Sequence, residues 1–224
     1  MSEPSISFRE VARRWLIANA LWILVAAIVE LIQLELSALG FDDFVEAYSM
    51  RLSCAVVTAV VCLIEFAIFA ALTAPVLRMI VPALSLRRWL AAHLMIGVLA
   101  GLFSFVALVE PAYLESIVRR YLVSLKLGVV PTTAILGAII GSIIGGIQAL
   151  ALRPAALGLN TWVRVSAVAG ILVCLTLLAG MALARTEDPL LDAVIVYSAA
   201  VVATGVGAVA MLLALRRLEP RGLG

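Results

Sequence analysis

The sequence predicts an all-α, polytopic integral membrane protein with six transmembrane helices. Two features of the composition support this class: 65% of the residues are hydrophobic and only 13% are charged. A soluble domain carries about twice that share of charge, so most side chains here must face lipid or other helices. The third observation is a set of six apolar runs, each long enough to cross the hydrocarbon core of a bilayer, which takes about 20 residues.

Each apolar run is expected to be a helix, because backbone amides and carbonyls cannot stay unpaired in lipid. The first run follows basic residues, as a cleaved signal peptide does. It continues through Glu30, Gln33 and Glu35, however, and lacks a clear small-residue cleavage site, so we interpret it as a retained helix. The six predicted spans are Trp15–Leu36, Leu52–Leu77, Trp89–Val109, Val129–Leu152, Val163–Ala184 and Leu190–Leu215.

The basic residues predict the direction of the helices. Six spans place both termini on one side, and eleven of the 16 lysines and arginines fall on that side. An excess of Lys and Arg marks the cytoplasmic side of a membrane, so we expect both termini in the cytoplasm. The eleven are Arg9, Arg13, Arg14, Arg78, Arg87, Arg88, Arg153, Arg164, Arg216, Arg217 and Arg221.

An amphipathic segment separates the third and fourth predicted spans. In residues 111–127, apolar side chains recur at the spacing of one helical face, and charged side chains lie on the other. This pattern predicts a helix lying on the outer membrane surface, either as a spacer or as a lid over the bundle. Its apolar residues are Leu114, Ile117, Val118, Tyr121, Leu122 and Leu125.

The helices also show a threefold internal pattern. Trp15, Trp89 and Trp162 begin the first, third and fifth helices at spacings of 74 and 73 residues, and the second, fourth and sixth helices each end with Leu-Arg. The residue types suit any helix end at a membrane interface, but that preference does not require nearly equal spacings. The pattern therefore predicts three hairpins within one membrane domain of residues 1–224. Their approximate bounds are 9–78, 87–153 and 162–217.

Small residues line one face of the fourth predicted helix. Gly137, Gly141 and Gly145 recur every four residues, which allows helix backbones to approach closely in lipid. We expect these glycines to serve packing between helices inside the bundle. A homo-oligomer interface is the alternative.

The end of that helix resembles a known sequence pattern. The stretch Gly141-x-x-x-Gly145-x-x-Gln148-x-x-x-Leu152-Arg153, followed by Trp162, resembles uncharacterised bacterial polytopic membrane proteins that contain repeated Gln-x-x-x-Leu-Arg hairpins. The resemblance covers about 25 residues and implies repeated hairpins in a bacterial inner membrane, without implying any chemistry. The other two predicted units lack the glutamine.

Few polar residues lie within the predicted spans, and an ionisable group there costs roughly 2.5–3.5 kcal/mol on insertion scales. Glu65, midway along the second span, is the leading candidate for an ion or ligand site. Glu30 and Gln33 share one face of the first span and are further candidates. His93 and Gln148 are secondary candidates. Because His93 is a lone histidine near a helix end, we expect it to be an interfacial residue.

Catalytic and metal-binding motifs are missing from the sequence. There is no H-E-x-x-H motif, P-loop or G-x-S-x-G elbow. Cys54, Cys62 and Cys174 lie in apolar runs and form no C-x-x-C pair, so we expect them to pack as small apolar residues. We therefore expect no catalytic residues, no metal and no cofactor. The net charge of +2 is too small to indicate nucleic-acid binding.

Two functional hypotheses follow. The first is a non-enzymatic scaffold or partner-binding subunit of a membrane complex, favoured by the small-residue faces and short loops. The second is a component of a small-molecule or ion/proton-coupled transporter that uses its intramembrane carboxylates. Beyond the lipid bilayer, the sequence leaves open a homo-oligomer, a hetero-complex partner and a small-molecule ligand. Convergence of Glu30, Gln33 and Glu65 on a cavity would favour the second hypothesis.

Overall fold

The computed structural model describes residues 7–38, 44–109, 128–184 and 189–221. Within these ranges, the side chains of 29–38, 44–51, 54, 106–109, 189, 190 and 193 are not described. The predicted outer helix at 111–127 lies outside the described residues.

Helices make up 88% of the structure, and six of them are long and apolar enough to span a membrane. This confirms the predicted fold class at the level of a six-helix membrane protein. Most helices extend beyond the predicted spans, because helical turns continue past the apolar runs into the polar ends. The helices are α1 (Phe8–Ala38), α2 (Phe44–Ile80), α3 (Leu86–Val109), α5 (Val129–Leu152), α6 (Leu159–Leu183) and α7 (Pro189–Arg216).

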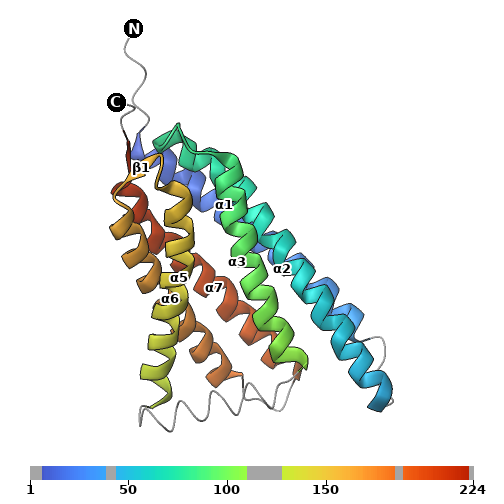
Figure 1. The fold of residues 1–224 in the computed structure, drawn as a ribbon. Coiled ribbons are helices and arrows are strands. Elements are labelled where there is room, and N and C mark those ends of the chain that lie inside the picture. The colour runs from blue at the N-terminus through green and yellow to red at the C-terminus, as the bar shows by residue number, and fades with distance from the viewer. Residues whose placement is uncertain (1–6, 39–43, 110–127, 185–188, 222–224) are drawn as a thin grey trace.

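The six helices form a closed ring. Each helix packs against the next in the order α1, α2, α3, α5, α6 and α7, and α7 returns to pack against α1. Figure 1 shows the N- and C-termini at the same end of the bundle, beside the α2–α3 and α5–α6 turns. From that end α3 and α5 diverge toward the other end. We call the end with the termini the basic end, because the described arginines at the helix ends gather there.

Large side chains fill the basic end. The largest fully buried residues of the described chain include Trp89, Trp162, Leu77, Leu152 and Leu215. Each of these three leucines precedes an arginine at the end of α2, α5 or α7. In each pair the leucine is buried in the bundle, and the arginine that follows it lies at the basic end.

A short strand pair fastens the C-terminal segment to the basic end. Strand β1 (Ala156–Leu157) pairs antiparallel with β2 (Glu219–Pro220), so the α5–α6 turn is joined to the residues after α7. The backbone N–H of Arg221 adds a bond to the carbonyl oxygen of Ala155 at 2.9 Å. Gly158 allows this close approach: its φ is +82°, and a Cβ atom there would overlap the carbonyl oxygen of Arg217.

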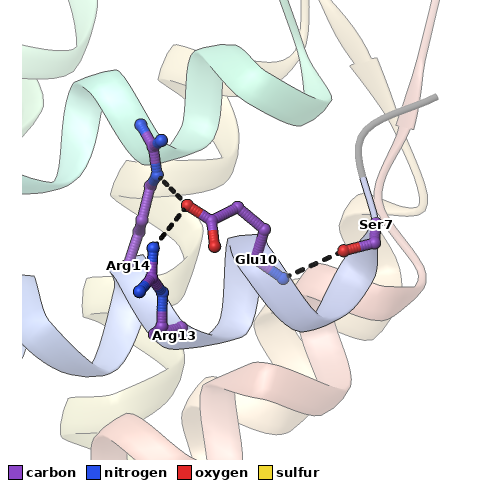
Figure 2. A network of polar contacts seen from close by, with 4 residues as sticks. All are labelled: Ser7, Glu10, Arg13 and Arg14. Carbon is purple, nitrogen blue, oxygen red and sulfur yellow. Dashed lines mark hydrogen bonds and ion pairs between the residues drawn. The ribbon is translucent and has the colours of Figure 1, made fainter. Parts of the chain in front are cut away.

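The start of α1 carries a polar cluster at the same end (Figure 2). The carboxylate Oε1 of Glu10 accepts from Arg13 at 2.9 Å and from Arg14 at 2.6 Å. The backbone N–H of Glu10 donates to the hydroxyl of Ser7 at 3.4 Å. These pairs at i,i+3 and i,i+4 support the first turns of α1, which precede its apolar run.

Small residues bring the helices together in the middle of the bundle. A Cβ atom on Gly137 would lie 2.5 Å from the carbonyl oxygen of Gly170, and one on Gly141 would overlap that of Ser166. A Cβ on Gly145 would lie 2.5 Å from the Cβ of Ser166. The glycine face of α5 is thus packed directly on the backbone of α6. Dispersion between close backbones replaces the hydrophobic drive that lipid removes.

Candidate functional site

A cavity of about 280 Å³ lies between the helices of the bundle. Its walls come from α1, α2, α5, α6 and α7, so helices far apart in sequence share it. None of the described residues that line it carries a carboxylate, ammonium, guanidinium or imidazole group. The cavity is therefore lined by neutral side chains.

Three buried polar residues lie on the wall of this cavity. Asn19 on α1, Gln148 on α5 and Ser166 on α6 are 5%, 8% and 6% exposed. Buried polar groups are costly unless they are hydrogen-bonded, so each side chain is held by a neighbour. The amide of Asn19 donates to the carbonyl oxygen of Trp15 at 2.8 Å. The hydroxyl of Ser166 makes a weak bond to the sulfur of Met211 at 3.6 Å.

Aromatic rings form one side of the cavity, where α1 meets α2. The rings of Trp22 and Phe69 meet edge to face with centroids 5.1 Å apart, and Trp22 and Phe66 are 6.4 Å apart. Trp15 packs edge to face on Phe69 at 6.4 Å. Edge-to-face pairs are favoured by the ring quadrupoles, so these contacts fix the shape of the wall.

Small residues form much of the opposite side, where α5, α6 and α7 meet, beside larger ones such as Ile144 and Met211. Gly141, Ala169, Gly170, Gly207 and Ala208 all line the cavity. They have little or no side chain to fill the interior. The aromatic residues of α1 and α2 thus face several small residues across the cavity.

A chain of hydrogen bonds leads from the cavity wall into the basic end. The indole N–H of Trp162 donates to Oε1 of Gln148 at 3.1 Å, and Nε2 of Gln148 lies 3.2 Å from Nε2 of His93. Nδ1 of His93 lies 2.9 Å from the carbonyl oxygen of Trp89. The indole N–H of Trp89 then donates to the hydroxyl of Thr73 at 3.1 Å.

This chain assigns the tautomer of His93. A carbonyl oxygen only accepts, so Nδ1 of His93 must carry the proton that bonds to Trp89. Nε2 then accepts from the amide N–H of Gln148, whose oxygen accepts from Trp162. Each donor in this series of hydrogen bonds thus meets an acceptor, and the series links α2, α3, α5 and α6.

The tryptophans near the start of α1, α3 and α6 are all buried and hydrogen-bonded. Trp15, Trp89 and Trp162 are 2%, 0% and 1% exposed. Trp15 donates its indole N–H to the carbonyl oxygen of Ala208 on α7 at 3.0 Å. Each tryptophan thus bonds to the helix that precedes its own around the ring. These residues hold neighbouring helices together.

Trp22 differs from the other three tryptophans. It lines the cavity, and its indole nitrogen is buried without a hydrogen-bond acceptor in the described part of the chain. The ring of Phe69 packs beside it. A buried N–H without an acceptor costs about 1–3 kcal/mol, so this donor lowers the stability of the aromatic wall.

The structure brings two of the predicted site residues together. Gln148 lines the cavity and is bonded to His93, although 55 residues separate them. His93 is fully buried, which differs from its expected interfacial position, because Trp89 and Phe69 cover its ring. Glu65 is partly exposed, takes part in an interaction of its own, and is not among the residues that line the cavity. The side chains of Glu30 and Gln33 lie outside the described residues.

Asn19 and Ser166 were not predicted as site residues, although the sequence holds a signal for them. Each of the three buried tryptophans is followed four residues later by a polar residue, namely Asn19, His93 and Ser166. All three polar residues are buried. Alignment of the three predicted hairpins on their tryptophans would have revealed this Trp-x-x-x-polar pattern, because residues i and i+4 share a helix face.

The site shows no arrangement that would hold a metal. No group of three His, Cys, Asp or Glu side chains comes together in the described part of the chain. The donors around the cavity are amide, hydroxyl, indole and sulfur groups, with the thiol of Cys174 among them. Such a set suits hydrogen bonding to a neutral molecule better than coordination of a hard cation.

Fold and cavity together define a class: a helical membrane protein with six spans and a neutral cavity inside the bundle. Comparison with protein-family models, curated proteins and solved structures found no match for this chain. Its function must therefore be inferred from the geometry of the cavity.

Proposed function

We propose that this protein is a non-enzymatic subunit of a bacterial inner membrane that binds a small molecule in its central cavity, as a component of a transport system. The observation that supports this proposal is the cavity itself. It combines an aromatic wall with a few convergent polar groups, namely Asn19, Gln148 and Ser166. This combination is typical of small-molecule sites, which are mostly apolar with a few placed hydrogen-bonding groups.

The proposed site differs from the carboxylate site that the sequence suggested. A proton-coupled mechanism needs an ionisable group that takes up and releases the proton. The described lining offers amides and hydroxyls instead of Glu65. The binding role that we propose therefore does not require coupling to a proton.

The proposed orientation places the basic end in the cytoplasm. Its support is the arginine excess at the end where both termini lie. A reporter that fluoresces only in the cytoplasm, fused to the C-terminus, should be bright. A reporter that is active only in the periplasm should be inactive there, and the reverse result would contradict this orientation.

We also propose that the bundle consists of three repeated hairpins. Three observations support the repeat: the buried Trp15, Trp89 and Trp162, the polar residue four positions after each, and the buried leucine near the end of α2, α5 and α7. The indole bonds follow the same order around the ring in all three units. On this view the cavity lies near the shared axis of the repeats, where repeated membrane folds often bind ligands.

A scaffold or partner-binding role is the second candidate. It is favoured by the firmly packed basic end, where the β1–β2 pair and exposed arginines such as Arg153 form a platform. Purification from the native membrane should then yield a stoichiometric protein partner. The proposed binding role does not require such a partner.

The test of the binding role uses a cavity-filling variant. Ala169 is buried and lines the cavity, whereas its neighbour Val168 is 52% exposed on the outside of α6. We expect mass spectrometry of the purified wild-type protein to detect a bound small molecule, which Ala169→Phe should lose and Val168→Phe should keep. A bound set that is identical in all three proteins would overturn the proposed function.

A further inference from the structure

We infer that the cavity accepts a neutral amphiphile: a membrane-soluble molecule with an uncharged hydroxyl or carbonyl group at one end and an apolar body. Its polar group would lie toward the basic end. This inference depends on the proposed binding function and adds the chemical class of the ligand.

The polar groups of the cavity are not spread evenly along the bundle. Asn19 precedes Trp22 along α1, so it lies nearer the basic end. Ser166 likewise precedes Cys174 along α6, and Gln148 lies close to the end of α5. The amide and hydroxyl groups of these three residues therefore lie at one end of the cavity, where they can donate to or accept from an uncharged oxygen of a ligand.

The other end of the cavity is mostly apolar, and its polar groups are the indole N–H of Trp22 and the hydroxyl of Thr204, which donates to the carbonyl oxygen of Ala200 at 2.9 Å. Trp22, Phe66, Ile140 and Val173 line it, and they lie closer to the middle of the spans. The seven residue steps from Trp15 to Trp22 span about 10 Å of helix, which is enough for a polar group and a short apolar body. A ligand with both parts would form hydrogen bonds at one end of the cavity and apolar contacts at the other. A uniformly polar or uniformly apolar molecule would make only one of these two kinds of contact.

The neutral lining selects against charge. Moving an ion out of water is costly unless an opposite charge meets it. No described residue that lines the cavity supplies such a charge. Gln148 also supplies no charge to a ligand, because its amide is neutral and is bonded to the neutral side chains of Trp162 and His93. A phosphate ester with the same apolar body should therefore bind poorly.

Three probes with similar apolar bodies test this inference. Geraniol carries a hydroxyl group, geranyl monophosphate carries a charged group, and myrcene is a hydrocarbon. Binding is measured by isothermal titration calorimetry with the full chain in lipid nanodiscs, after subtraction of empty nanodiscs. We expect geraniol to bind about tenfold tighter than myrcene, as one or two hydrogen bonds to the ligand would provide. Geranyl monophosphate should give no saturable binding.

Two variants locate the polar contact. In Asn19→Leu and Ser166→Ala we expect the advantage of geraniol over myrcene to fall severalfold, while myrcene binds as before. Each variant has a matched control away from the cavity. Asn160→Leu makes the first change at an exposed position, and Ser142→Ala makes the second on α5 outside the lining. Both controls should keep the full preference for geraniol.

The outcomes separate this inference from the proposed function. Equal binding of geraniol and myrcene, tighter binding of the phosphate, or an undiminished preference in Asn19→Leu and Ser166→Ala would overturn the neutral amphiphile and leave a binding cavity. If no probe binds, the ligand class is also overturned. The proposed function then stands only if Ala169→Phe still removes a native compound that Val168→Phe retains.

Discussion

The two halves of the bundle are held together by different kinds of contact. The basic end holds the largest buried side chains, with Trp89, Trp162, Leu77 and Leu152 almost completely enclosed among buried alanines. In the other half the buried residues are small, such as Ala55, Gly137, Gly180 and Ala203. One half is joined by interlocking side chains and indole hydrogen bonds, and the other by close contact of backbones.

The difference follows from the solvent at each depth. Near the basic end water is close, so burial of a large apolar side chain is favourable and an indole N–H needs a partner. Deep in the bilayer the lipid is as apolar as leucine, and close packing of small residues is the available source of attraction. The cavity lies where the two kinds of packing meet, between the indoles of α1 and the small residues of α5, α6 and α7.

The largest effect is expected from truncation of a buried leucine at the basic end. Leu152 is 0% exposed, so Leu152→Ala should lower the free energy of unfolding by about 2–3 kcal/mol through the cavity it leaves. Leu150 lies two residues earlier and is 64% exposed, and Leu150→Ala should change stability by less than about 0.5 kcal/mol. Unfolding by SDS in mixed micelles measures both, and equal losses would show that the basic end is not specifically packed.

A methyl group added to the glycine face tests the other half. Gly141→Ala should destabilise the protein by about 1–3 kcal/mol, because the new Cβ would overlap the carbonyl oxygen of Ser166. Gly146 lies on the same helix, and a methyl group there would meet no neighbouring atom within 4 Å, so Gly146→Ala should be neutral or slightly stabilising. The same SDS unfolding assay applies. A harmless Gly141→Ala would mean that α5 and α6 do not need close backbone contact.

A smaller effect on stability is expected from the hydrogen bond between Thr73 and Trp89. A double-mutant cycle with Thr73→Val and Trp89→Phe isolates the bond between the hydroxyl of Thr73 and the indole of Trp89. Bonds of this kind in membrane proteins contribute about 0.6 kcal/mol on average. We expect a coupling energy near that value from unfolding curves of the four proteins. Additive effects of the two substitutions would argue against the bond.

The smallest effect is expected at the exposed cluster of Glu10, Arg13 and Arg14 (Figure 2). Exposed ion pairs contribute little because water screens them. Glu10→Gln should therefore leave the thermal unfolding temperature unchanged within error, at both low and high salt. A clear loss that disappears at high salt would show that this cluster stabilises the basic end.

The sequence predicted much of the fold because the bilayer constrains it. Apolar runs of sufficient length predicted six helices, and an even number of spans correctly placed both termini at one end. The ends of the helices were less predictable, since α1 begins at Phe8 and α2 extends to Ile80 through turns that are not apolar. The closed ring was not predictable, because no local pattern specifies that α7 returns to α1.

The site was predicted only in part. Gln148 was predicted as a polar residue within a span, but Asn19 and Ser166, which also lie within spans and line the cavity, were not. Glu65 was predicted as the leading site residue because it is an ionisable group within a span, but it is not among the residues that line the cavity. The distance between His93 and Gln148 depends on how α3 and α5 cross, and that crossing is set by side-chain packing, which a single sequence does not reveal.

The closure of the ring has a consequence for the biogenesis of the protein. The bond from the indole of Trp15 to the carbonyl oxygen of Ala208 joins residues 193 positions apart. Domains are generally built from the N-terminus during synthesis, so Trp15 enters the membrane long before its acceptor is made. Until α7 arrives, the nascent bundle is an open arc whose inner face adjoins lipid. A lipid-like molecule would then have its easiest entry before the last helix closes the wall.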